Sequence, residues 1–100
     1  MNTELSQLID LLVYWVKQQA LPLWSTTGID TRTGSSHERL LASGKPDLLC
    51  TKRIKVQLRQ IIVFSIAAER GWLKNSDVLV ETLESFLKEN ATINNRKELY

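Results

Sequence analysis

The segment Cys50–Trp72 constrains the fold of this chain more than any other. It contains no proline, and its single glycine, Gly71, stands next to its end. Its second half, Ile61–Ala68, is apolar at every position except Ser65. A short apolar run is compatible with a strand, but the length of the segment favours a helix, with Gly71 as its left-handed C-terminal cap. Because no face of the second half is polar, we expect other elements to cover this helix on every side.

An amphipathic helix is predicted near the N-terminus. Thr3 is a suitable N-cap, and apolar residues recur at helical spacing through Leu5–Val16. Pro22 lacks an amide donor, so we expect it to kink or end this helix near Gln19. The following segment, Ser25–Ser36, is rich in Thr, Ser, Gly and Asp, which predicts a loop of about a dozen residues.

A short β-hairpin is predicted after this loop. His37–Leu41 and Lys45–Leu49 flank the segment Ala42–Gly44, which reads as a turn with Gly44 at its end. A lone two-stranded hairpin is marginally stable, so we expect it to lean on the helices.

A third helix is predicted over Ser76–Asn90, where an apolar stripe lies opposite acidic and basic residues. The segment Ala91–Tyr100 is polar and aperiodic, and we expect it to be poorly ordered. The predicted fold class is therefore all-α with a short β-hairpin. Residues 1–90 would form one partial domain, and residues 91–100 a polar tail.

Composition narrows the functional classes. The chain has 100 residues and a formal net charge of +2, which is too small to indicate a nucleic-acid partner. Its single cysteine, Cys50, permits no internal disulfide and has no metal-ligand spacing, so we expect a reducing, cytoplasmic location. No signal peptide or transmembrane pattern is present, and we expect no membrane partner.

Few residues are candidates for catalysis, metal binding or ligand binding. His37 is the single histidine, so the chain supplies no pair of imidazoles for acid–base catalysis and no metal cluster. A structural role is the more common one for such a residue. Arg59 stands one turn before the apolar run, where we expect a partly desolvated guanidinium that grips an acceptor. Gly28 and Gly34 have no phosphate-loop spacing, and we expect no cofactor.

Several motifs in a fixed order carry a resemblance to a known family. They are LPLW at 21–24, GIDTRTG at 28–34, HERL at 37–40, GKP at 44–46 and KRIKVQLRQIIVFSIAAERGW at 52–72. The chain resembles the N-terminal part of the N-acylglucosamine 2-epimerase superfamily, in particular its mannose isomerase and mannose-6-phosphate isomerase-like branch. The resemblance extends over about residues 21–87.

The resemblance implies an (α/α)6 barrel, of which this chain would supply the first three helices. The first helix would be outer, Lys52–Arg70 inner and Ser76–Asn90 outer. In the family an arginine of the R-Q pair lines the sugar pocket, and it falls on Arg59 here, with His37 as a secondary candidate for substrate binding. The family's catalytic histidines and glutamate lie in later segments that this chain does not contain.

Two functional hypotheses follow. In the first, the chain is the N-terminal fragment of a sugar isomerase or epimerase that moves a proton next to the carbonyl of a mannose-type sugar, and it is inactive alone. The sequence departs from the family at Gly34–Ser36, which replaces G-G-F, and at Ile62, which replaces a tyrosine. In the second, it is a small helical interaction module or a degenerate remnant without catalysis. We also expect self-association, aggregation or a molten state in place of a rigid monomer, because three helices leave apolar surface exposed.

Overall fold

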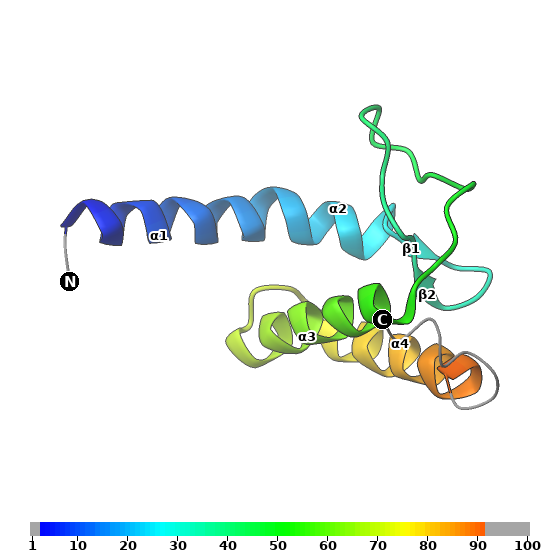
Figure 1. Ribbon diagram of the computed structural model, residues 1–100. Coiled ribbons are helices and arrows are strands. Elements are labelled where there is room, and N and C mark those ends of the chain that lie inside the picture. Colours follow the sequence, from blue (N-terminus) through cyan, green and yellow to red (C-terminus); the bar gives the residue numbers. More distant parts are fainter. Residues whose placement is uncertain (1–2, 92–100) are drawn as a thin grey trace.

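The computed structural model describes residues 3–91. Along the chain it contains α1 (Thr3–Trp15), the π-helical segment η1 (Val16–Ala20), α2 (Leu21–Thr26), β1 (Ile29–Asp30), β2 (Ser35–Ser36), α3 (Ile54–Arg70) and α4 (Ser76–Ala91), as Figure 1 shows. The described part is mostly helical with one small antiparallel hairpin, which confirms this level of the predicted fold class. The predicted disorder of the tail concerns residues that, from 92 on, lie outside the described part.

The first three helical segments form one continuous rod that passes through Pro22 (Figure 1). We expected a kink or an end near Gln19, and of these two alternatives the end is wrong, because the helix continues after a π-helical interruption at Val16–Ala20. The amide of Leu21 donates to the carbonyl of Val16, five residues back, so the helix widens by one π turn before the proline. Pro22 then stands at the start of α2, where a missing amide donor is tolerated best.

A hairpin forms inside the segment predicted as a loop. β1 and β2 pair antiparallel, with Ile29 opposite Ser36 and Asp30 opposite Ser35. The amide of Gly34 donates to the carbonyl of Asp30 at 2.9 Å, and Gly34 has a φ of +78°, which a glycine adopts without strain. The turn at Gly34 thus brings the two strands together. Each strand is too short for an alternation of polar and apolar residues to be visible in the sequence.

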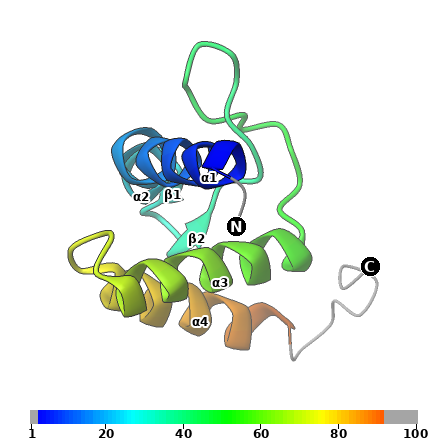
Figure 2. The same cartoon turned by 90° about the vertical axis from the view of Figure 1, so that its left-hand side faces the viewer.

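The hairpin predicted over residues 37–49 is reduced to a single bridge between Leu40 and Pro46. The amide of Leu41 donates to the carbonyl of Lys45 at 2.7 Å, so the chain does turn near Gly44. Pro46 has no amide to extend a ladder, which limits pairing at this position. The segment forms a loop that stands away from the helices in Figures 1 and 2.

The core lies where α2 meets the antiparallel-packed pair α3 and α4 (Figures 1 and 2). Its fully buried members are Leu21, Phe64, Ala67 and Leu83. Gly71 ends α3 with a φ of +67°, which confirms the predicted left-handed cap. The core therefore joins the end of the N-terminal rod to the second half of α3.

The prediction that α3 is covered on every side is wrong. Leu58, Ile62 and Ile66 follow one another at intervals of four residues, and all three are exposed. The described elements pack against the opposite side of α3, which carries Phe64 and Ala67. The apolar composition of the run reflects two apolar faces, and only one of them has a neighbour among the described residues.

α1 projects beyond the rest of the described chain, as Figure 1 shows. None of its residues is buried. The radius of gyration is 15.0 Å, whereas a compact domain of this length has about 13 Å. No helix in residues 3–91 has the length and apolar character needed to cross a membrane.

Candidate functional site

The first half of α3 is fixed to the hairpin by one side-chain amide. The Oε1 atom of Gln57 accepts a hydrogen bond from the amide of Ser36 at 2.8 Å, and its Nε2 atom donates to the carbonyl of the same residue at 2.8 Å. Both residues are almost completely buried. The side-chain amide of Gln57 thus satisfies both the N–H and the C=O of Ser36, as the backbone of a neighbouring strand would. In this way Gln57 connects β2 to α3.

Gln60 reinforces this attachment from the next turn of α3. Its Nε2 atom donates to the Oγ atom of Ser36 at 3.1 Å, and that hydroxyl can in turn donate to the carbonyl of His37 at 3.2 Å. We call Ser36, Gln57 and Gln60 the amide clamp. The clamp sets the position of α3 relative to the hairpin.

A buried carboxylate closes the hairpin beside the clamp. Asp30 is 3% exposed and forms ion pairs with Lys52 and with Arg32, the latter at 3.3 Å. The hydrogen bond from Lys52 holds the pKa of Asp30 well below its usual range, with further help from Arg32 and against the opposing effect of burial. Lys52 lies just before α3, so this ion pair joins the hairpin turn to the start of that helix.

A second carboxylate holds the long loop onto the N-terminus of α3. Glu38 accepts a hydrogen bond from the amide of Arg53 at 2.9 Å and two further contacts of 2.7 Å from its guanidinium. Arg53 is the extended N-cap residue of α3. Negative charge at this end of a helix is favourable, so Glu38 stabilises the start of α3 as well as the loop.

The two residues predicted as substrate contacts lie in different surroundings. His37 is 7% exposed, and its amide donates to the carbonyl of Gly28 at 2.8 Å. The ring has no hydrogen bond to any residue of the described part. This burial favours the structural role that is the more common one for a lone histidine.

Arg59 lies on the exposed side of α3, away from the amide clamp. Within the helix it shares a face with Lys55, Ile62 and Ile66, three or four residues apart along α3. Its guanidinium has no hydrogen bond or ion pair among residues 3–91, so the predicted internal acceptor is absent there. A permanently charged fork with unused donors is available to a ligand on this face.

The single thiol offers no reactive site. Cys50 donates from its Sγ atom to Asp47 at 3.3 Å, and Asp47 is also paired with Arg39 at 2.8 Å. The contact with Asp47 raises the pKa of the Cys50 thiol. A thiol whose deprotonation is disfavoured is a poor nucleophile.

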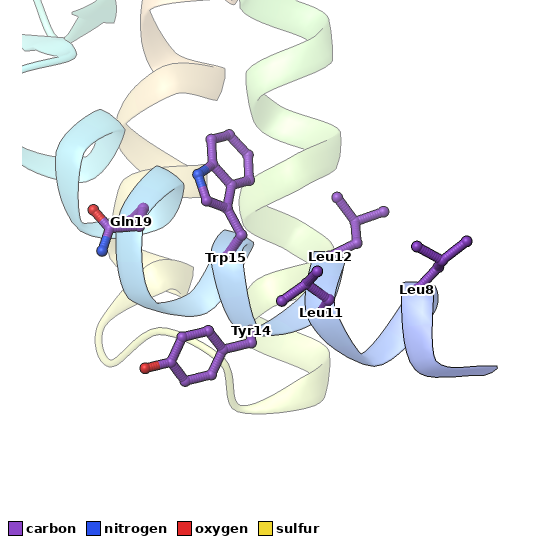
Figure 3. Close-up of a pocket in the computed structure, with 6 residues that line it drawn as sticks. All are labelled: Leu8, Leu11, Leu12, Tyr14, Trp15 and Gln19. Atoms are coloured by element: carbon purple, nitrogen blue, oxygen red, sulfur yellow. The ribbon is translucent and has the colours of Figure 1, made fainter. Parts of the chain in front are cut away.

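A hollow of about 570 Å³ opens on α1 and not beside Arg59. Figure 3 shows its lining, which consists of Leu8, Leu11, Leu12, Tyr14, Trp15 and Gln19. All six belong to α1 and η1, and the polar groups among them are the glutamine amide, the tyrosine hydroxyl and the indole N–H of Trp15. The hollow is therefore separate from the predicted sugar contacts. No group of three or more metal-binding side chains occurs in residues 3–91.

The comparison with curated proteins gives one relevant match. Over 61 residues the chain is 38% identical to a mannose-6-phosphate isomerase of Rhizobium meliloti (strain 1021). This stretch is similar to part of a sugar isomerase. It covers 61% of the chain but only 16% of the length of the relative. No family model matches the chain, and no solved structure matches it.

Sequence reasoning named Arg59 as a candidate, which stays a prediction, and it missed the residues that hold the helix of Arg59 in place. Gln57, Glu38 and Asp30 all lie inside motifs that carried the resemblance, namely V-Q-x-R-Q, H-E-R-L and G-I-D. A polar residue inside an apolar helical segment was the available signal for Gln57. Its partner could not be named, because 21 residues separate Gln57 from Ser36.

Proposed function

We propose that this chain is the N-terminal, substrate-contacting part of an isomerase or epimerase for mannose-type sugars. In this proposal residues 1–90 belong to an (α/α)6 barrel and residues 91–100 form a polar tail. The observation that carries it is the 38% identity over 61 residues to a protein named mannose-6-phosphate isomerase. The motif order that produced the family resemblance supports the same reading.

Arg59 is the residue proposed to contact the sugar. It is exposed on α3, and no acceptor among the described residues occupies its guanidinium. The two sides of α3 suit different tasks, since Gln57 and Phe64 attach the helix to its neighbours while the Arg59 side stays open. A permanently charged guanidinium of this kind can bind sugar hydroxyls and can stabilise negative charge that develops on a carbonyl oxygen.

The proposed chemistry of the whole enzyme is proton transfer at the carbon next to the aldose carbonyl, through an enediolate. That step needs a positioned acid and base within reach of the substrate. The single imidazole, that of His37, is buried and away from the Arg59 face, so the chain has no histidine that could serve this role beside Arg59. We therefore expect sugar binding without turnover.

Turnover and binding are tested on the same protein. The purified chain is incubated with mannose in D₂O, and proton NMR follows fructose formation and exchange of the proton on C2. We expect neither above the buffer blank, whereas saturation-transfer signals from mannose should appear and should be lost in Arg59→Ala. Lys55→Ala, one turn earlier on the same face, is the matched control and should keep the signal. Equal signals from the wild type and Arg59→Ala would contradict the proposal.

A helical interaction module remains the second candidate, because apolar residues are exposed on both α1 and α3. This reading predicts association with protein and no response to sugar. The saturation-transfer experiment distinguishes the two, since a module has no reason to bind mannose through Arg59.

A further inference from the structure

Gln60 stands between the packed and the open sides of α3. It follows Arg59 directly, so the two side chains leave the helix about 100° apart. Gln57, three residues earlier, is almost completely buried, whereas Gln60 is only partly buried. Val63 is 43% exposed and lies four residues after Arg59 and three after Gln60, and side chains at these spacings are neighbours on a helix. The outer edge of Gln60 therefore adjoins the same exposed surface as Arg59.

The hydroxyl of Ser36 fixes the orientation of the Gln60 amide. This hydroxyl has one hydrogen to donate, and the two carbonyl oxygens within its reach, those of His37 at 3.2 Å and Gly28 at 3.4 Å, can only accept. The hydrogen is thus committed to a carbonyl, and the Oγ atom is left to accept a hydrogen bond from Gln60. The Nε2 atom of Gln60 therefore faces Ser36, at 3.1 Å, and the Oε1 atom lies on the other side of the amide group.

The Oε1 atom of Gln60 has no hydrogen bond among residues 3–91. In that part of the chain no fully buried nitrogen or oxygen of a buried or partly buried side chain lacks a partner, so this oxygen is open to solvent. A carboxamide oxygen accepts hydrogen bonds and cannot donate them, whereas the guanidinium of Arg59 donates and cannot accept. The two groups together suit a sugar, because each sugar hydroxyl can both donate and accept a hydrogen bond.

We propose that the Oε1 atom of Gln60 is a second sugar contact, which accepts a hydrogen bond from one hydroxyl of a mannose-type sugar while Arg59 binds another oxygen of it. The inference rests on the proposed function, and it adds a requirement that the arginine alone does not impose. An acceptor that cannot donate selects for a free hydroxyl at one position of the sugar and discriminates against a sugar that lacks this hydroxyl. Gln60 thus has two tasks, since its nitrogen belongs to the amide clamp and its oxygen contacts the sugar.

The affinities of the full chain for mannose and for its deoxy derivatives at C1, C2, C3, C4 and C6 test this contact. Saturation-transfer NMR titrations measure them for the wild type and for Gln60→Met, which keeps the length of the side chain and removes the oxygen. We expect one deoxy sugar to bind the wild type about 3- to 10-fold more weakly than mannose does, because it lacks the hydroxyl that Gln60 accepts from. In Gln60→Met this preference for mannose should disappear.

Two further variants separate the sugar contact from the clamp. Ser36→Ala removes the hydrogen bond that anchors the amide nitrogen of Gln60 but leaves the Oε1 atom in place, so it should keep most of the preference that Gln60→Met loses. Gln60→Glu retains an acceptor oxygen and should keep the preference as well. Far-UV circular dichroism confirms that each variant has the wild-type helicity.

The outcomes distinguish this inference from the proposed function. Mannose binding that depends on Arg59, with the same hydroxyl preference in the wild type and in Gln60→Met, would overturn the inference and leave the proposed function standing. An equal loss of the preference in Ser36→Ala and Gln60→Met would also overturn it, because Gln60 would then act only through the clamp. A chain that binds no mannose would overturn both.

Discussion

The side chain of Gln57 binds the backbone of Ser36 in both directions, with two hydrogen bonds of 2.8 Å. This residue pair, together with the hydrogen bond from Gln60 to the Ser36 hydroxyl, joins the small hairpin to the first half of α3. Because both residues are buried, water cannot replace either hydrogen bond without opening the structure. The orientation of α3, and with it the direction in which the Arg59 face points, depends on this contact.

Removing the clamp amide should be costly. In Gln57→Ala the amide and the carbonyl of Ser36 lose their partners inside the protein, and we expect a loss of about 2–4 kcal/mol in the free energy of unfolding. Gln60→Ala removes one bond to a hydroxyl that has other acceptors nearby, and should cost about 1 kcal/mol. Urea unfolding followed by tryptophan fluorescence measures both. Equal losses in the two variants would mean that the two hydrogen bonds of Gln57 contribute no more to stability than the single bond of Gln60.

The ion pair between Lys52 and Asp30 should make stability depend on pH. The pKa of Asp30 is lower in the folded protein than in the unfolded chain, where it is about 3.9. The stability due to the ionised carboxylate is therefore fully present above the unfolded pKa, and it is lost as the pH falls toward the folded one.

Lys52→Met tests this linkage. It removes the largest cause of the depressed pKa, so the variant should be less stable than the wild type at pH 7, and the difference should shrink as the pH is lowered below about 4. Thermal melts at a series of pH values measure the difference. Lys55→Met removes a lysine that has no ion pair in the described chain and should show no such convergence. A constant difference between Lys52→Met and the wild type down to pH 2 would contradict the assignment.

The two sides of α3 should respond differently to truncation. Phe64 is fully buried, and Phe64→Ala should cost about 3–5 kcal/mol because it opens a cavity in the core. Arg59→Ala removes an exposed side chain without an internal partner, and its effect should stay within about 0.5 kcal/mol. Circular dichroism melts compare the two. A larger effect of the arginine change would place Arg59 in the folded core and not on an open face.

Gly28 should not tolerate a side chain. A Cβ atom built at this position would lie 2.6 Å from the carbonyl oxygen of Trp24 and 2.8 Å from its Cα atom. The obstacle is backbone, which cannot move aside as a flexible side chain does, so Gly28→Ala should cost about 1–3 kcal/mol. Chemical denaturation measures the loss, and a neutral result would show that the end of α2 shifts freely.

Local signals in the sequence predicted the elements that depend on nearby residues. The cap at Gly71 and the helices around it follow from spacing and turn chemistry within a few positions, and the structure confirms them. Pro22 does not end the helix, because one π turn before it removes the conflict that a proline creates in a regular helix. The helix-breaking tendency of proline, taken alone, does not predict this π turn.

The candidate site was harder to predict, because its contacts are distant in sequence. The identity of Arg59 came from a motif, whereas its exposure depends on which elements pack against α3. An apolar run such as Ile61–Ala68 indicates that a helix packs against other elements. It does not indicate how many faces of the helix are packed. The partners of Gln57 and Asp30 depend on the hairpin, whose strands are too short to be recognised in the sequence.

The most direct test of the proposed sugar contact is the backbone amide spectrum of the ¹⁵N-labelled chain, recorded while mannose is added. Our account predicts that the largest shifts occur on the exposed side of α3, at Arg59, Ile62 and Ile66, while Gln57 and Phe64 on its packed side change little. The same titration of Arg59→Ala should leave these amides unmoved. Shifts confined to other parts of the chain, or none at all at saturating sugar, would contradict the assignment of Arg59 as a sugar-binding residue.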